Sequence, residues 1–93
     1  MLESKIQTNI IQYLESIGYL TVKNIAVSKP GWPDLTIIKP NGHHFYIEVK
    51  QPGKKLRPIQ EARHQQLRGH NVKVITATSV AEVKEYLDGN ANR

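Results

Sequence analysis

The stretch GWPDLTIIKPNGHHFYIEVK, residues 31–50, predicts a β-hairpin around which the rest of the chain is arranged. Its central KPNG contains a proline that suits a type I turn, and Gly42 can adopt the left-handed conformation that closes a three-residue hairpin loop. This loop sets the register of the two strands. Continued along them, the register places Asp34 directly opposite Glu48.

The hairpin has one apolar and one polar face, because side chains alternate along a strand. The apolar face, which needs a core to pack on, consists of Leu35, Ile37, Phe45, Ile47 and Val49. The polar face consists of Asp34, Thr36, Tyr46, Glu48 and Lys50.

Asp34 and Glu48 face each other on the polar side. Opposed carboxylates about 5 Å apart at Cβ destabilise a hairpin unless something offsets their charge. A divalent cation is a natural partner, since Mg²⁺ is typically held by one or two carboxylates with water and phosphate oxygens. Lys50 points the same way and can reach a phosphate or an attacking water. The alternative is an ordinary hairpin with a solvated polar face, but the turn chemistry independently aligns the carboxylates and favours a site.

Composition limits the classes of protein to consider. The 93 residues make one domain, residues 1–93, and the net charge of +5 favours a polyanionic partner, nucleic acid first, although many small proteins are mildly basic. The absence of cysteine excludes a disulfide framework and a thiolate zinc site, and the four histidines lack zinc-ligand spacing. Without a membrane-spanning run or a signal peptide, we expect a soluble, cytoplasmic protein with no membrane partner.

Residues 2–17 predict an amphipathic helix that stops at Gly18. Glu3 lies on the same stripe of this helix as the apolar residues. One explanation is that a carboxylate in the first turn complements the helix dipole at a fraying end. The other is that the helix packs on the sheet and directs Glu3 at Asp34 and Glu48. The apolar stripe consists of Ile6, Ile10, Tyr13, Leu14 and Ile17.

Residues 19–28 are rich in β-branched and apolar residues and predict a first strand. Residues 29–33 (KPGWP) then break regular structure directly before Asp34. Gly31 could let the backbone approach a ligand closely. Trp32 could stack on a base or sugar, or it could fill a hydrophobic gap beside the hairpin, and the sequence favours neither explanation.

The segment after the hairpin, residues 51–57, is a basic turn. It lies at the end of the strand that carries Glu48 and Lys50, so its cations could follow a phosphate backbone. A solvated loop is the alternative. The cations are Lys54, Lys55 and Arg57.

A second helix is predicted over residues 58–68, with a proline in its first turn and Gly69 as its cap residue. Gln60 and His64 lie one turn apart and share an edge of its weak apolar face. The apolar residues of that face are Ile59, Ala62 and Leu67.

Residues 72–77 (VKVITA) predict a last strand. Ser79 is expected to cap a final helix over residues 80–87, with Glu82 at the capping-box position, and residues 88–93 are expected to form a frayed tail. The order α-β-β-β-α-β-α predicts an α/β (α+β) sandwich around a small mixed sheet.

Four motifs in this order resemble those of the PD-(D/E)xK nucleases, and among these most closely the virus-type replication-repair nuclease (VRR-NUC) domain in a minimal stand-alone form. The resemblance covers nearly the whole chain and implies a restriction-endonuclease-like fold. Any one motif is weak, whereas four with the expected elements between them are specific. The motifs are Glu3, Gly31-Trp32-Pro33-Asp34, Glu48-Val49-Lys50 and Gln60.

The resemblance implies a role for each matching residue. The two hairpin carboxylates would bind metal together with the backbone carbonyl of Val49, and Glu3 would support the metal directly or through water. Lys50 would orient or activate the attacking water. The catalytic set implied is Glu3, Asp34, Glu48, Lys50 and Gln60.

The implied activity is a metal-dependent, structure-selective DNA endonuclease that uses Mg²⁺, with Mn²⁺ as a substitute. Within the family, small stand-alone copies suggest homodimers that act on branched DNA such as four-way (Holliday) junctions in DNA repair. A flap or single-strand nuclease, and a nucleic-acid-binding module that does not cut, are the alternatives. The residues expected to contact DNA are Lys29, Trp32, Lys54, Lys55, Arg57 and His64.

Overall fold

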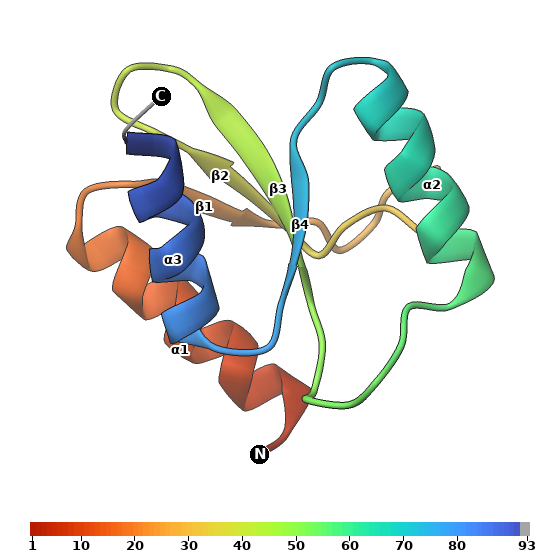
Figure 1. Cartoon of the computed structure of the whole chain (residues 1–93), viewed down its shortest axis with the longest axis horizontal. Coiled ribbons are helices and arrows are strands. Elements are labelled where there is room, and N and C mark those ends of the chain that lie inside the picture. The colour runs from red at the N-terminus through yellow and green to blue at the C-terminus, as the bar shows by residue number, and fades with distance from the viewer. Residues whose placement is uncertain (92–93) are drawn as a thin grey trace.

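The computed structural model describes residues 1–91, with side chains as far as residue 89. The helices and strands follow in the predicted order, which is therefore confirmed (Figure 1). They are α1 (Glu3–Ser16), β1 (Leu20–Lys23), β2 (Leu35–Ile38), β3 (His44–Val49), α2 (Pro58–Gly69), β4 (Val74–Ala77) and α3 (Val80–Ala91).

The four strands form one mixed sheet in the order β1-β2-β3-β4. The pairs β1-β2 and β2-β3 are antiparallel, whereas β4 runs parallel to β3. Helix α2 is the crossover that this parallel pair requires. The hairpin register predicted from the turn is confirmed, because Leu35 pairs with Ile47. Gly42 has the predicted left-handed conformation, with φ of 89°.

Helices cover both faces of the sheet: α1 and α3 lie on one face and α2 lies on the other (Figure 1). All five residues of the predicted apolar face of the hairpin are buried. They form the core with α1 and α3, as the alternation of side chains predicts. The helical contribution to this core comes from Ile6, Ile10, Leu14 and Val83. In the part of the chain that the structure describes, no helix is long and apolar enough to cross a membrane.

The first strand is shorter than predicted. It was expected over residues 19–28 and spans only Leu20–Lys23. Asn24 leaves the strand and bonds through its main chain and its side chain to the segment that precedes β2. The apolar residues that suggested a longer strand, Ile25 and Val27, are exposed instead of paired.

The end of α2 also differs from the prediction. Gly69 is helical, His70 is the C-cap, and Asn71 takes the left-handed conformation, with φ of 64°. The N–H groups of Asn71 and Val72 donate to carbonyls of the last turn, which closes the helix as a Schellman motif. Because Val72 takes part in this cap, the strand predicted to start there starts at Val74.

The last helix is longer than predicted, since residues 88–91, expected in a frayed tail, are helical. Residues 92–93 of that tail lie outside the described residues. Ser79 caps α3 as predicted, because its Oγ accepts the N–H of Glu82 at 3.2 Å. The carboxylate of Glu82 reaches back to Thr78, one residue before the cap.

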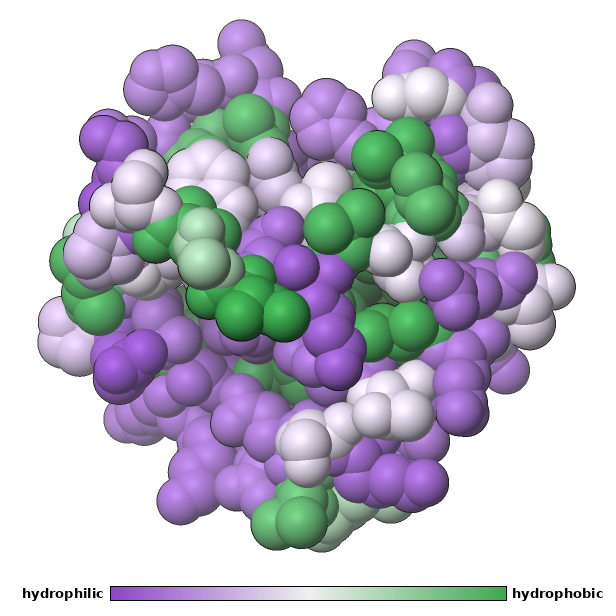
Figure 2. Space-filling model, turned by 180° about the vertical axis from the view of Figure 1, so that it is seen from behind, coloured by the Kyte–Doolittle hydropathy of each residue, from purple (hydrophilic) through white to green (hydrophobic). Residues whose placement is uncertain are grey.

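Strand β1 forms one edge of the sheet. Its residues Leu20 and Val22 are exposed and pair with β2 on the face opposite to the α1/α3 core. Seen from behind, the surface carries apolar groups separated by hydrophilic ones (Figure 2). The sheet therefore keeps an apolar region that no helix of the described chain covers.

Candidate metal centre

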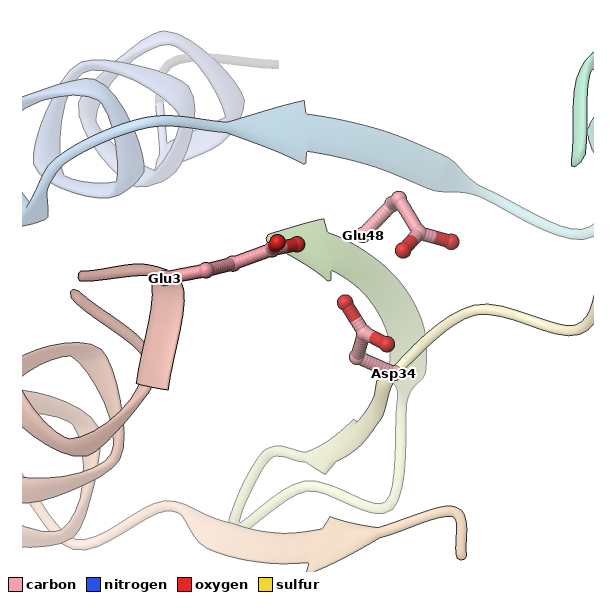
Figure 3. A group of neighbouring side chains, drawn as sticks. All are labelled: Glu3, Asp34 and Glu48. Carbon is pink, nitrogen blue, oxygen red and sulfur yellow. The ribbon is translucent and has the colours of Figure 1, made fainter. Parts of the chain in front are cut away.

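Three carboxylates from three separate segments meet beside the end of the central hairpin (Figure 3). Glu3 extends from the first turn of α1, Asp34 directly precedes β2, and Glu48 lies near the end of β3. Each offers one oxygen, and the three oxygens lie within 4.8 Å of one another. Of the two explanations for Glu3, the structure therefore agrees with the second, in which the helix directs it at the other carboxylates.

Hydrogen bonds fix Asp34 from two sides. The N–H of Val49 donates to its Oδ2 at 2.8 Å, and the N–H of Asn24 donates to its main-chain carbonyl at 2.8 Å. The Asn24 side chain donates to the carbonyl of Pro33 and accepts the hydroxyl of Thr36, each at 3.0 Å. The end of β3 thus holds the carboxylate of Asp34, and the residue after β1 holds its main chain.

Gly31 lies against the main chain of α2, whereas the approach of a ligand to its backbone stays a prediction. Its φ of 78° is left-handed, and a Cβ there would lie 2.9 Å from the carbonyl carbon of Ile59 and closer still to its oxygen. Nearby, Nε of Arg63 donates to the carbonyl of Pro30 at 2.9 Å. Only glycine lets the loop before Asp34 lie this close to the helix backbone.

Glu48 is the most buried of the three carboxylates, with 1% of its surface exposed. Burial, together with a hydrogen bond and the negative charge of Asp34, raises the pKa of Glu48 from 4.5 to about 9. The pair therefore holds a proton at neutral pH when no cation is bound. A divalent cation can replace that proton, and carboxylate oxygens are the ligands that Mg²⁺ and Mn²⁺ prefer. The residues present fit such an ion.

Two side chains of α2 contact Glu48. Nε2 of Gln60 donates to its Oε2 at 3.4 Å, and Nε2 of His64 lies 3.2 Å from its Oε1. Oε1 of Gln60 also accepts the N–H of Arg57 at 2.9 Å, so the same amide closes the first turn of the helix. Burial, and then the charge of Arg68, lowers the pKa of His64, so its imidazole is neutral at pH 7.

The buried face of α2 is more polar than predicted. Gln60, His64 and Leu67 are buried, whereas Ile59 and Ala62, expected on the apolar face, are exposed. The expected contact of His64 with DNA is wrong, because its side chain is 0% exposed. The helix turns polar groups inward because it packs over a carboxylate.

Val49 ends β3 and Lys50 follows it, and their main-chain groups point in different directions. The N–H and carbonyl of one strand residue point to the same side, so the carbonyl of Val49 points toward Asp34, as its N–H does. The N–H of Lys50 donates to the carbonyl of Ala77 at 3.0 Å, on the β4 side. The Lys50 side chain lies on the Glu48 face, where its positive charge opposes the rise in the Glu48 pKa.

The turn that carries Glu3 is tied to the segment after β3. The side chain of Gln51 donates to the carbonyl of Met1 at 2.9 Å. The N–H groups of Lys5 and Ile6 donate to the carbonyl of Leu2 at 3.0 and 3.1 Å. These bonds fix the start of α1 beside the strand that carries Glu48.

The residues predicted to contact DNA, other than His64, reach the surface. The indole of Trp32 packs edge to face on Tyr46, with ring centroids 5.5 Å apart, and remains half-exposed. This contact agrees with the gap-filling explanation of Trp32, although part of its surface stays accessible. The exposed cations are Lys29, Lys54, Lys55 and Arg57.

Two residues that hold the site were missed in the sequence, Asn24 and Gln51. Asn24 lies inside a run of β-branched residues that we interpreted as strand, although asparagine is depleted in strands and marks the point where β1 ends. Gln51 begins a basic turn and carries no local signal, because its partner is 50 residues away.

An α/β sandwich whose central hairpin aligns Asp34 with a Glu-x-Lys sequence, and whose first helix adds a third acid, has the architecture of the PD-(D/E)xK nucleases. A comparison with protein families gives the narrower assignment. The VRR-NUC domain matches residues 1–81, and the chain belongs to this nuclease family.

Individual relatives agree with the family. The chain is 29% identical over 83 residues to "Putative nuclease p44" of Acyrthosiphon pisum secondary endosymbiont phage 1, which covers 87% of this chain and 89% of that protein. A solved structure titled "VRR_NUC domain" matches with a TM-score of 0.84 and 28% identity, over 92% of this chain and 94% of its own. A second solved structure, "VRR_NUC domain protein", matches with a TM-score of 0.76 and 19% identity, over 95% of this chain and 86% of its own, and supports the fold alone.

Proposed function

We propose that this nuclease is a metal-dependent DNA endonuclease that hydrolyses phosphodiester bonds, with Mg²⁺ as its cofactor and Mn²⁺ as a substitute. The observation that carries the proposal is the convergence of three carboxylate oxygens within 4.8 Å beside the central hairpin. A protein that only binds nucleic acid has no use for acidic groups that face a polyanion. The net charge of +5 supports a polyanionic substrate.

In this proposal, Asp34, Glu48 and the carbonyl of Val49 hold the cation, and Glu3 supports it directly or through water. The bound ion neutralises charge on the scissile phosphate and lowers the pKa of the attacking water. The bond from the Val49 N–H to Asp34, at 2.8 Å, fixes one carboxylate relative to the other strand before substrate arrives.

Lys50 orients the attacking water and shares the charge that develops on the phosphate. Its ammonium group is a compact donor on the same face as Glu48. Gln60 acts one step further away, because its amide is buried against Glu48 and holds that carboxylate in place. Gln60 is therefore a positioning residue in this proposal, and Lys50 is a catalytic residue.

Exposed cations in the segments before and after the central hairpin bind the phosphate backbone of the substrate. Lys54, Lys55 and Arg57 follow the Glu48 strand, and Lys29 precedes the Asp34 strand together with Trp32. Each phosphate contact releases counterions, so affinity for DNA falls steeply with salt concentration. The half-exposed ring of Trp32 offers a surface on which a base or sugar can pack.

We further propose that the substrate is branched DNA, such as a four-way junction, and that the protein acts as a homodimer. Two-fold symmetry gives two centres for paired cuts. The exposed edge strand β1, with Leu20, Val22 and the neighbouring Ile25, offers apolar surface that a second copy can cover.

The test is cleavage of labelled four-way junction, flap and linear duplex with Mg²⁺, Mn²⁺ or EDTA, beside Asp34→Ala. The expected result is metal-dependent paired cuts in the junction, absent in the variant. Cleavage of flaps or of every substrate would keep the nuclease and reject the junction preference. Tight binding without cleavage would favour a module that only binds DNA.

A further inference from the structure

His64 stands out among the buried polar residues of the protein. Its side chain is 0% exposed, and its Nε2 lies 3.2 Å from Oε1 of Glu48. Its other ring nitrogen, Nδ1, is buried with no hydrogen-bond partner among the described residues. A buried polar atom without a partner typically costs about 1–3 kcal/mol.

We propose that His64 is a positioning residue of the metal centre, which donates its Nε2–H to Glu48 and thereby fixes the plane of that carboxylate. The inference rests on the proposed metal-dependent function. An ionised carboxylate only accepts hydrogen bonds, so a Glu48 that binds a cation requires the proton of the neutral imidazole on Nε2. The same requirement leaves Nδ1 without a proton, and within the described residues no donor bonds to it.

The geometry around Glu48 explains what the positioning achieves. Gln60 contacts Oε2 and His64 contacts Oε1, so α2 supplies one donor to each oxygen from the same side. A carboxylate has about four lone-pair positions, and two remain for ligands on the opposite side. The oxygens of Asp34 and Glu3 lie within 4.8 Å of a Glu48 oxygen and would supply the other ligands. Partners of this kind around a metal ligand typically change metal affinity by about 10–100-fold.

The position of α2 makes this contact specific. Gly31 lies against the main chain of the helix at Ile59, which sets the distance between α2 and the loop that ends at Asp34. Further along the same helix, Nε2 of His64 lies 3.2 Å from Oε1 of Glu48 on β3. A side chain at position 64 therefore needs a hydrogen-bond donor as far from the helix main chain as Nε2 of histidine. The shorter side chain of asparagine cannot place its amide there.

The matched variants for the test are His64→Gln and His64→Asn. Both introduce a neutral amide, but only glutamine places its donor where Nε2 lies. We expect Mn²⁺ affinity, measured by calorimetric titration, to stay within about threefold of wild type in His64→Gln and to fall about 10–100-fold in His64→Asn. Unfolding in urea with EDTA should show similar stability for the two variants.

The outcomes separate this inference from the proposed function. Equal Mn²⁺ affinity in wild type and both variants would overturn the role of His64 and keep the metal centre. If the Mn²⁺ affinity of the two variants fell in proportion to their stability in urea, the role of His64 would be purely structural. Absence of Mn²⁺ binding by the wild type, with Asp34→Ala as the reference, would overturn both proposals. In the wild type with Mg²⁺, ¹⁵N shifts of the imidazole should report the proton on Nε2, and a proton on Nδ1 would contradict the inference.

Discussion

The proton held by Glu48 leads to a prediction about stability. In the folded protein without metal the pKa of this group is about 9, against 4.5 as its ordinary value. Between these values the folded state binds more protons than the unfolded state, so the free energy of unfolding falls as pH rises. Glu48→Gln keeps the shape of the side chain and does not titrate. We therefore expect wild type to lose stability relative to Glu48→Gln between pH 5 and pH 8.

The size of the effect follows from the pKa. One pKa unit corresponds to about 1.36 kcal/mol, so the three pH units set an upper limit of roughly 4 kcal/mol. Relaxation around a buried charge reduces such values, and we expect about 2 kcal/mol. The lowered pKa of His64 acts in the opposite direction, with stability lost as pH falls below the ordinary histidine range, but both proteins share it.

The assay is urea unfolding of both proteins in EDTA at pH 5, 6, 7 and 8. Glu85→Gln serves as the control, since it removes an exposed carboxylate from α3 and should follow wild type at every pH. A difference between wild type and Glu48→Gln that stays constant from pH 5 to pH 8 would refute the reasoning. With Mn²⁺ present, wild type should gain stability and Glu48→Gln should not, because the cation binds only the folded ionised site.

Other variants test the remaining parts of the site. Lys50→Ala should lower the rate of single-turnover cleavage at least about 100-fold, because stabilisation of the developing charge is lost. Fluorescence anisotropy should show that DNA binding is retained, and equal losses of cleavage and of binding would contradict the role of Lys50. Asp34→Ala should abolish Mg²⁺ uptake in calorimetry, and unchanged uptake would count against the assigned ligands. Gly31→Ala should destabilise the fold by more than about 2 kcal/mol in urea unfolding, because a Cβ meets the Ile59 main chain. Its control, Gly42→Ala, has a similar φ in open space and should lose only about 1–2 kcal/mol.

Much of the hairpin could be predicted because its chemistry is local. The turn around Gly42 fixes the register, and the register alone aligns Asp34 with Glu48. The stripe on α1 likewise indicated a helix that packs on the sheet and carries Glu3 at its first turn. These features depend on residues that lie close together in the sequence.

The support of the site from α2 could not be predicted, because it depends on tertiary contacts. The apolar pattern of the helix is weak, and its buried positions include the polar Gln60 and His64. Nothing local shows that the backbone at Gly31 would meet the main chain of α2. The end of β1 was missed for a related reason, since the side-chain partners of Asn24 are Pro33, in the loop before β2, and Thr36, within β2.

The contact between Gly31 and α2 leaves the outer surface of that helix open to redesign. Gly31 meets the main-chain carbonyl of Ile59, while the Ile59 side chain is 44% exposed. Side chains on this surface can therefore change without moving the helix relative to the carboxylates. Because the chain contains no cysteine, Ile59→Cys or Ala62→Cys would give a single attachment point for a fluorophore or spin label. Such a label would follow α2 during metal and DNA binding from outside the site.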